Sequence, residues 1–158
     1  MIVEGTYSFT GRPQAVWDLL LDPTVIAKSM PGTKELVRTA PDRYQGKMQV
    51  TVGPITAAEF AVEIALSDLE PPQRFVMTID GTGRFGFTRG RARVDLQPEN
   101  GGTRMAYHAD LQVGGKIASV GQRLLDMVSR ALLRSGLQAL SRELEERLAQ
   151  DGRTEEAG

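Results

Sequence analysis

Few side chains in this sequence could carry out chemistry, and histidine and cysteine set the first limits. The 158 residues include one histidine, His108, and no cysteine. The lack of cysteine excludes a disulfide, a thiolate nucleophile and a Cys-ligated zinc or iron–sulfur site. The period-two pattern places His108 beside Asp110 on the outward face of a predicted strand. It therefore cannot complete a Ser-His-Asp triad or a multi-histidine metal site inside the protein, and we expect neither a metal nor a cofactor.

A glycine-rich segment, Gly81-Thr82-Gly83-Arg84-Phe85-Gly86, has the spacing of a dinucleotide-binding fingerprint. That fingerprint requires a helix directly afterwards, because the helix N-terminus holds the pyrophosphate. Residues 89–94 instead alternate with period two, as a strand does. We interpret the segment as a connection between two strands.

Arginines gather around this connection and could indicate a nucleic-acid surface. The chain as a whole has 19 basic and 20 acidic residues, and no aromatic residues are interleaved with the arginines on the same face. We interpret the group as the outer face of a sheet, opposite acidic residues of neighbouring strands, and expect no nucleic-acid partner. The arginines are Arg84, Arg89, Arg91, Arg93 and Arg104, and the acidic residues are Glu59, Glu63 and Asp95.

The inward-facing polar side chains are hydroxyls only: Tyr7, Tyr44, Thr103 and Tyr107. A buried tyrosine usually needs no more than a hydrogen-bond partner. Acid–base catalysis would require a carboxylate or imidazole held near a substrate, and the strand pattern places none inside. We therefore predict a binding protein with no catalytic residues.

The elements that position these side chains follow from hydrophobic periodicity. Alternating residues predict about seven strands, beginning with residues 3–9 and ending with 105–113, and two short helices at residues 13–22 and 23–28. A helical period then runs from Ile117 to about Leu148, and the glycine pivot at residues 113–121 joins it to the last strand. At ~1.5 Å per residue, some thirty residues span ~45 Å, enough to cross the sheet. We expect one domain over residues 1–150 and a frayed tail over residues 151–158.

A helix folded back across such a sheet would enclose an apolar slot, in which methionines suit either an irregular core or an adaptable pocket. The predicted lining is Trp17, Met30, Met48, Phe60, Val62, Ile64, Met77, Ile79, Tyr107, Leu124, Met127, Val128 and Ala131. Glycines and prolines predict an entrance formed by Pro31, Gly32, Gly53, Pro54, Gly114, Gly115 and Lys116.

The element order resembles the α+β helix-grip fold of the START and birch-pollen-allergen superfamily, also called SRPBCC. Four segments, residues 16–23, 30–32, 50–55 and 113–118, resemble signature segments of the CoxG family of carbon monoxide dehydrogenase subunits, and the likeness covers residues 2–148. The chain departs from the family in having Lys28-Ser29-Met30 where a cysteine is common, and we expect it to lack the long C-terminal extension that many members carry.

The resemblance implies an accessory protein of a molybdenum hydroxylase, associated with the membrane and handling a hydrophobic molecule such as a quinone or a lipid. The first residues lack a secretory signal, so we expect a cytoplasmic protein with peripheral contact at the inner face of the membrane. Two other functions stay open, since fold analogy alone does not decide function. They are a polyketide-cyclase-like small enzyme and an interaction protein without a ligand.

Overall fold

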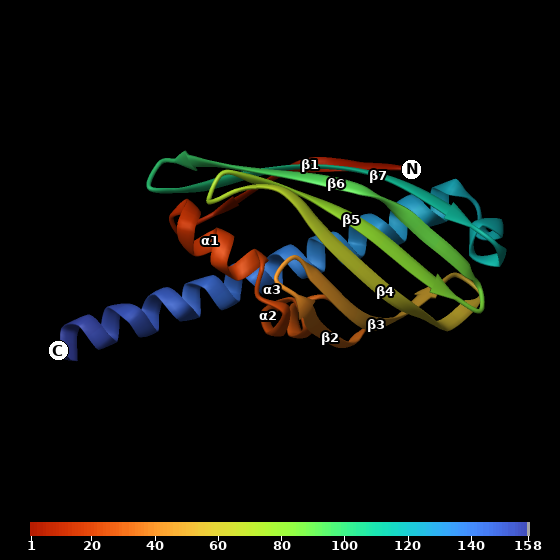
Figure 1. Cartoon of the computed structure of the whole chain (residues 1–158), viewed down its shortest axis with the longest axis horizontal. Coiled ribbons are helices and arrows are strands. Elements are labelled where there is room, and N and C mark those ends of the chain that lie inside the picture. The colour runs from red at the N-terminus through yellow and green to blue at the C-terminus, as the bar shows by residue number, and fades with distance from the viewer. Residues whose placement is uncertain (158) are drawn as a thin grey trace.

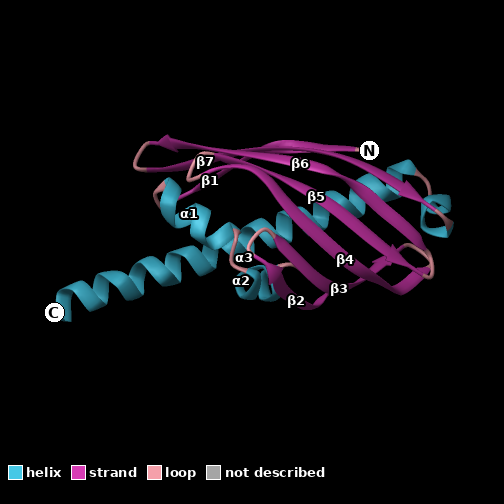
Figure 2. Cartoon of the chain, in the orientation of Figure 1, coloured by secondary structure: helices cyan, strands magenta, loops and turns pink. Residues whose placement is uncertain are grey.

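A seven-stranded antiparallel sheet curves around one long helix in the computed structural model, which describes residues 1–157 and the side chains of residues 1–152 (Figure 1). The strand order is β1-β7-β6-β5-β4-β3-β2, so the first two strands of the chain form the two edges. Figure 2 shows the helices gathered on one side of the sheet. The predicted α+β helix-grip architecture is confirmed. The elements are β1 (Ile2–Phe9), α1 (Pro13–Leu20), α2 (Pro23–Ser29), β2 (Thr33–Ala40), β3 (Arg43–Val52), β4 (Ile55–Glu70), β5 (Arg74–Gly83), β6 (Gly86–Glu99), β7 (Gly102–Gly114), the 3₁₀ helix η1 (Lys116–Val120) and α3 (Gln122–Ala157).

The glycine-rich segment is a strand connection, as its sequence predicted. β5 ends at Gly83 and β6 begins at Gly86, and the two strands pair in antiparallel register. The arginines beyond it lie on the outer face, where Arg93 pairs with Asp95 at 3.1 Å and Arg89 pairs with Asp80 at 3.6 Å. His108 is also outside, with its Nδ1 atom 2.8 Å from Glu4.

The junction between β7 and α3 differs from the continuous helix predicted from Ile117. A short 3₁₀ helix comes first, and Gly121, with φ +97°, separates it from α3. The right-handed α-helix requires negative φ, so the long helix can begin only after this glycine. Ile117 is buried, and its N–H donates to the carbonyl of Phe85 at 2.7 Å. The chain is thus fixed to the β5–β6 turn before it enters α3.

The far end of α3 also differs from the prediction. The helix continues to Ala157, so the end predicted near Leu148 is wrong. No proline follows Leu148 to stop the helix, and the one glycine between Leu148 and Ala157, Gly152, costs only ~1 kcal/mol in a helix interior. Gly158 and the side chains of residues 153–158 lie outside the described residues, so the fraying of the tail stays a prediction.

The second helix fastens α3 to the rest of the domain. Asp22 caps α2, since its carboxylate accepts hydrogen bonds from the N–H groups of Thr24 and Val25. The same carboxylate lies 2.9 Å from Arg147 of α3, and Lys28 lies 3.0 Å from Glu143. Burial alone would raise the pKa of Asp22, but the bonds from Arg147, Val25 and Thr24 outweigh it and lower the pKa below its ordinary value of 3.8.

Two separate groups of buried apolar residues form the core. The first cluster lies where α1, α2 and the middle of α3 meet the sheet, and the second lies where η1 and the start of α3 meet β3 and β4. The buried members of the first cluster are Phe9, Val16, Trp17, Leu19, Val25, Tyr44, Leu66, Phe75, Val94, Leu96, Met105, Leu137, Leu140 and Leu144. Those of the second cluster are Val52, Ile55, Ala58, Phe60, Ile117 and Leu125.

We predict that Gly115→Ala destabilises the fold more than Gly121→Ala. Both glycines have a positive φ that disfavours alanine, at a cost on the order of 1–3 kcal/mol. At Gly115 an added Cβ would also lie 2.6 Å from the Cα of Gly86, whereas at Gly121 it would meet nothing within 4 Å. Urea unfolding of the two variants measures the difference. Equal losses would show that the approach to Gly86 contributes nothing.

We predict that Asp22→Asn lowers stability at neutral pH and flattens its acid dependence. Asparagine caps a helix as well as aspartate does, so the variant removes mainly the charge that faces Arg147. Because the folded pKa lies below 3.8, the stabilisation is present above the unfolded pKa and is lost as the pH falls through the folded pKa. Urea unfolding at neutral and acidic pH measures this. A difference between wild type and variant that persists in strong acid contradicts the assignment.

Candidate functional site

The middle of the interior belongs to neither cluster. Met48, Ile79, Leu111 and Leu132 lie at inward positions by strand alternation or helical period, but each is only half-buried and none packs into either cluster. On the sheet, Ile79 is opposite Gly90, which is opposite Leu111, so these positions form one row across β5, β6 and β7. We name these four residues the central zone. Its partial exposure shows that the helix and sheet do not close tightly there.

Small residues explain why the central zone stays open. The inward positions in the middle of β5, β6 and β7 include Gly81, Gly90, Ala92 and Ala109, between bulkier residues at both ends. A Cβ added at Gly81 would find its nearest neighbour, the carbonyl oxygen of Thr88, at 3.8 Å. That separation is ordinary van der Waals contact, so a Cβ fits at Gly81, whereas at Gly90 it would meet the backbone of Asp110.

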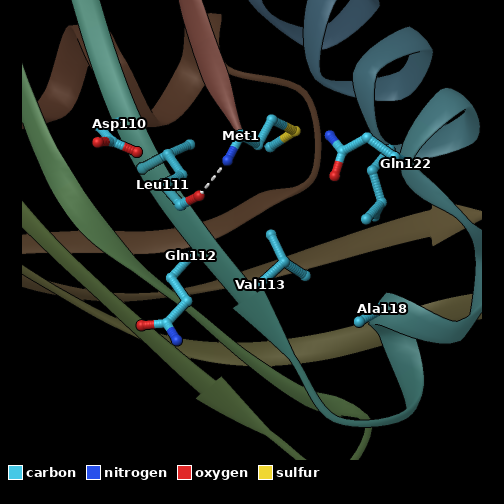
Figure 3. Close-up of a pocket in the computed structure, with 8 residues that line it drawn as sticks. Met1, Asp110, Leu111, Gln112, Val113, Ala118 and Gln122 are labelled. Carbon is cyan, nitrogen blue, oxygen red and sulfur yellow. Dashed lines mark hydrogen bonds between the residues drawn. The ribbon is translucent and has the colours of Figure 1, made fainter.

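A pocket of about 370 Å³ opens between the end of β7 and the start of α3. Figure 3 shows Leu111 and Val113 on β7, with Ala118 and Gln122 across from them. The pocket is in contact with Leu111 of the central zone and with Leu125 of the second cluster, and the polar residues Asp110, Gln112 and Gln122 also line it. Its lining is Met1, Asp110, Leu111, Gln112, Val113, Ala118, Gln122 and Leu125.

The predicted lining residues divide among these regions. Trp17 is buried in the first cluster, edge to face with Phe75 at 5.4 Å between ring centroids, and Phe60 is buried in the second. Ile64, Met77 and Tyr107 pack against the first cluster, and Val62, Leu124 and Val128 against the second. Met48 and Ile79 lie in the central zone. The half-buried Met30 lies against α3, where its sulfur is 3.2 Å from a Cβ built at Gly136.

Met127 and Ala131 were predicted to face the sheet, and the structure corrects both. Met127 is 60% exposed, and both residues line a shallow groove on the outer side of α3. The first half of α3 has apolar residues over a wide arc, which left its rotation ambiguous in the sequence. The arc that is buried contains Leu125, Gly136 and Leu137, and the burial of these positions fixes the rotation.

The predicted entrance residues border the second cluster. A Cβ at Gly53 would lie 2.6 Å from the Leu124 side chain, and one at Gly32 would meet the carbonyl oxygen of Gln49. The ammonium of Lys116 lies 5.6 Å from the Phe85 ring centroid. None of the predicted entrance residues lines the pocket at the end of β7, although its residue Val113 directly precedes Gly114. The predicted lining also omitted all eight residues of this pocket.

The inward hydroxyls fall into two kinds. Tyr44 donates to the carbonyl of Leu21 at 2.8 Å and accepts from Arg38 at 3.2 Å, and Thr103 donates to the carbonyl of Gly11 at 2.7 Å. Neither Tyr7 nor Tyr107 donates a hydrogen bond to any described residue, and neither hydroxyl is closed off from solvent. The hydroxyl of Tyr107 lies over Gly5 of the edge strand β1, where it can bond to water or to another molecule.

Two further features bear on the chemistry. Among the residues that the structure describes, no three His, Cys, Asp or Glu side chains come together as a metal site would require. No helix in the same part of the chain is long and apolar enough to cross a bilayer.

Comparison of the sequence with models of protein families identifies the family of this chain. The model of the carbon monoxide dehydrogenase CoxG family matches residues 5–145. The chain belongs to the CoxG family. Family membership makes it a relative of an accessory subunit of a carbon monoxide dehydrogenase system. No protein of curated description matches the chain.

Solved structures with the START superfamily fold resemble this CoxG family member. It is similar to a conserved protein from Geobacillus kaustophilus, with 26% identity, 92% of this chain and 96% of that chain covered, and a TM-score of 0.86. A START superfamily protein from Mycobacterium smegmatis has 14% identity, coverage of 92% and 97%, and a TM-score of 0.71. The Zhui aromatase/cyclase from a Streptomyces species has 16% identity, coverage of 94% and 95%, and a TM-score of 0.70.

We predict different stability effects for the two inward tyrosines. Tyr44→Phe removes the bond to Leu21 and should cost about 1 kcal/mol, the usual net contribution of such a bond. Tyr107→Phe removes no hydrogen bond to a described residue and should leave stability nearly unchanged. Urea unfolding of both variants tests this. A large loss in Tyr107→Phe would mean that its hydroxyl serves the fold.

Proposed function

We propose that this chain is a non-catalytic carrier of a hydrophobic small molecule, of quinone or lipid type, held between the sheet and α3. The observation that carries the proposal is the partial exposure of apolar, inward-facing side chains in the central zone. A filled core would bury them. An apolar molecule lying between the two clusters would remove their exposed surface from water, which is the main source of binding energy for such ligands.

The expected affinity suits a carrier. Covering about 400 Å² of an apolar chain at ~25 cal/mol per Å² gives ~10 kcal/mol before costs. Loss of several kcal/mol for restricted freedom leaves roughly micromolar binding. A ligand held at this strength can be delivered and released.

The free hydroxyl of Tyr107 supplies a polar contact for the ligand. It is an inward hydroxyl without a hydrogen bond to a described residue, and a phenol can donate to a carbonyl oxygen. Quinones and lipid esters both present such an oxygen beside an apolar chain. A single donor inside an apolar site would fix the orientation of the ligand without adding a charge.

Family membership supports a role beside a redox enzyme. We propose that the carrier serves a molybdenum hydroxylase of the carbon monoxide dehydrogenase type and contacts the inner face of the membrane peripherally, which is where a quinone or lipid would be exchanged. Lys116 and Arg84, which both lie within 6.0 Å of the Phe85 ring, provide positive charge at the end of the domain that holds the predicted entrance. Anionic headgroups would be attracted to this charge.

An enzyme of cyclase type remains the second candidate. One structural neighbour is an aromatase/cyclase, and the hydroxyl of Tyr107 makes no hydrogen bond to a described residue. Tyr44 is a poor catalytic candidate, because its hydroxyl is engaged by Leu21 and Arg38. A pH-dependent turnover of a polyketide-like substrate that is lost in Tyr107→Phe would favour the enzyme over the carrier.

We predict that Gly81→Leu prevents ligand retention, because its side chain would extend into the space beside Val62 and Phe60. Thr82→Leu is the matched control, since Thr82 neighbours Gly81 but is exposed on the outer face. Protein purified from its native host would be extracted with organic solvent and analysed by mass spectrometry, with thermal melts to confirm folding. Wild type and Thr82→Leu should yield the same hydrophobic compound, and Gly81→Leu should yield much less. A wild type that never carries such a compound contradicts the proposal and favours a ligand-free interaction protein.

A further inference from the structure

The outer side of α3 carries a regular stripe of exposed residues that the ligand site does not use. Its members follow a 4-3 spacing, the repeat by which two helices pack along a shared seam. All but Ser141 and Gly152, which are half-buried, are exposed. We name this stripe the outer seam: Met127, Ala131, Arg134, Gln138, Ser141, Glu145, Leu148 and Gly152.

The charged side chains along the outer seam form no ion pairs with described residues, and basic and acidic side chains lie at different ends of the seam. Arg134 and its neighbour Arg130 form no ion pair with any described residue, and neither does Glu145 or Glu146. By contrast, Arg147 and Glu143, on the side that faces α2, are both paired. In the first half of the outer face Arg123, Arg130 and Arg134 outnumber Asp126, and around Glu145 the two acids Glu145 and Glu146 outnumber the exposed Arg142.

The outer seam also exposes apolar surface. Met127 is 60% exposed and Leu148 is 39% exposed, and both lie on the seam. Between them, a shallow groove is lined by Arg123, Asp126, Met127, Arg130, Ala131 and Arg134. Its floor includes the small side chain of Ala131, so it offers space for a larger apolar side chain from outside.

We propose that the outer seam is a self-association surface, on which a second copy of this chain packs α3 against α3 in antiparallel orientation. With the two-fold axis between Gln138 and Ser141, each position meets a complementary one. Arg134 faces Glu145, Leu148 enters the groove at Ala131, and Gln138 faces Ser141. Such an isologous contact repeats every favourable pair twice.

A parallel arrangement would not fit, because it would bring Arg134 against Arg134 and Glu145 against Glu145. The contact length supports a reversible dimer. From Met127 to Gly152 the seam runs ~38 Å at ~1.5 Å per residue. A strip of that length and about 10 Å width covers less than the roughly 800 Å² per partner of a standard stable interface. The dimer should therefore dissociate on dilution.

Sedimentation velocity over a concentration series tests the proposal. The wild type should shift from monomer to dimer as concentration rises. Arg134→Glu and Glu145→Arg should each weaken dimerisation by tenfold or more, because each sets like charges opposite one another. The double variant carrying both exchanges should restore it. Arg91→Glu, an exposed change of the same charge on the outer sheet face, is the control and should dimerise as the wild type does.

A spin-label measurement locates the contact. The chain has no cysteine, so Gln138→Cys introduces one labelling site next to the proposed axis, and Thr6→Cys introduces one on the outer face of β1. Labels at Gln138 should show a short distance between copies that disappears in Arg134→Glu, and labels at Thr6 should not.

Three outcomes overturn the proposal. They are a wild type that stays monomeric at every concentration, a double variant that does not recover, and a dimer without a short distance at Gln138. A monomer that binds anionic lipid vesicles, less in Arg134→Glu and more in Glu145→Arg, would assign the outer seam to a lipid surface instead. None of these results depends on whether the interior holds a ligand.

Discussion

Contact of α3 with the sheet through two separated apolar clusters is the constraint on which the interior depends. A helix is stiff over this length, so it cannot bend into the gap between two points of support. The first cluster holds its middle and the second its beginning. Between them the sheet presents small residues next to the longer side chains of Ile79 and Leu111, which are only half-buried. The partial exposure of the central zone is what a stiff helix held at two separate points, above small residues of the sheet, would produce.

The two regions of contact do not hold α3 equally firmly. The middle and later part of α3 is tied to α2 by the pairs of Asp22 with Arg147 and of Lys28 with Glu143, in addition to apolar packing. The first part of α3 makes no ion pair to another element within the described residues and is held by the second cluster and by a weak hydrogen bond from the Ser129 hydroxyl to the Met1 sulfur. The pocket at the end of β7 lies beside this less restrained part. Passage of a ligand there would disturb fewer contacts than passage near α2.

Charged side chains and apolar side chains lie in different parts of the molecule. Charged side chains lie on the outer face of the sheet, on the outer side of α3 and in the ion pairs between α2 and α3, while the inward positions carry mainly apolar side chains and a few hydroxyls. Such an interior would suit an uncharged molecule. Family membership and this distribution of charge are independent observations, and both support the proposed carrier.

The sequence by itself determined the fold, because strand alternation and the helical period record which face of each element meets the core. It also identified Gly81–Gly86 as a strand connection and His108 as a surface residue, since both depend only on local period. The tertiary structure decided the features that the periodicity of a single strand or helix does not determine. It fixed the rotation of α3, which places Met127 and Ala131 outside, because the apolar arc there is too wide to specify one inner side. It also decided where the interior is left open, since that depends on small residues of β5, β6 and β7, distant in sequence, meeting in one region beneath the helix.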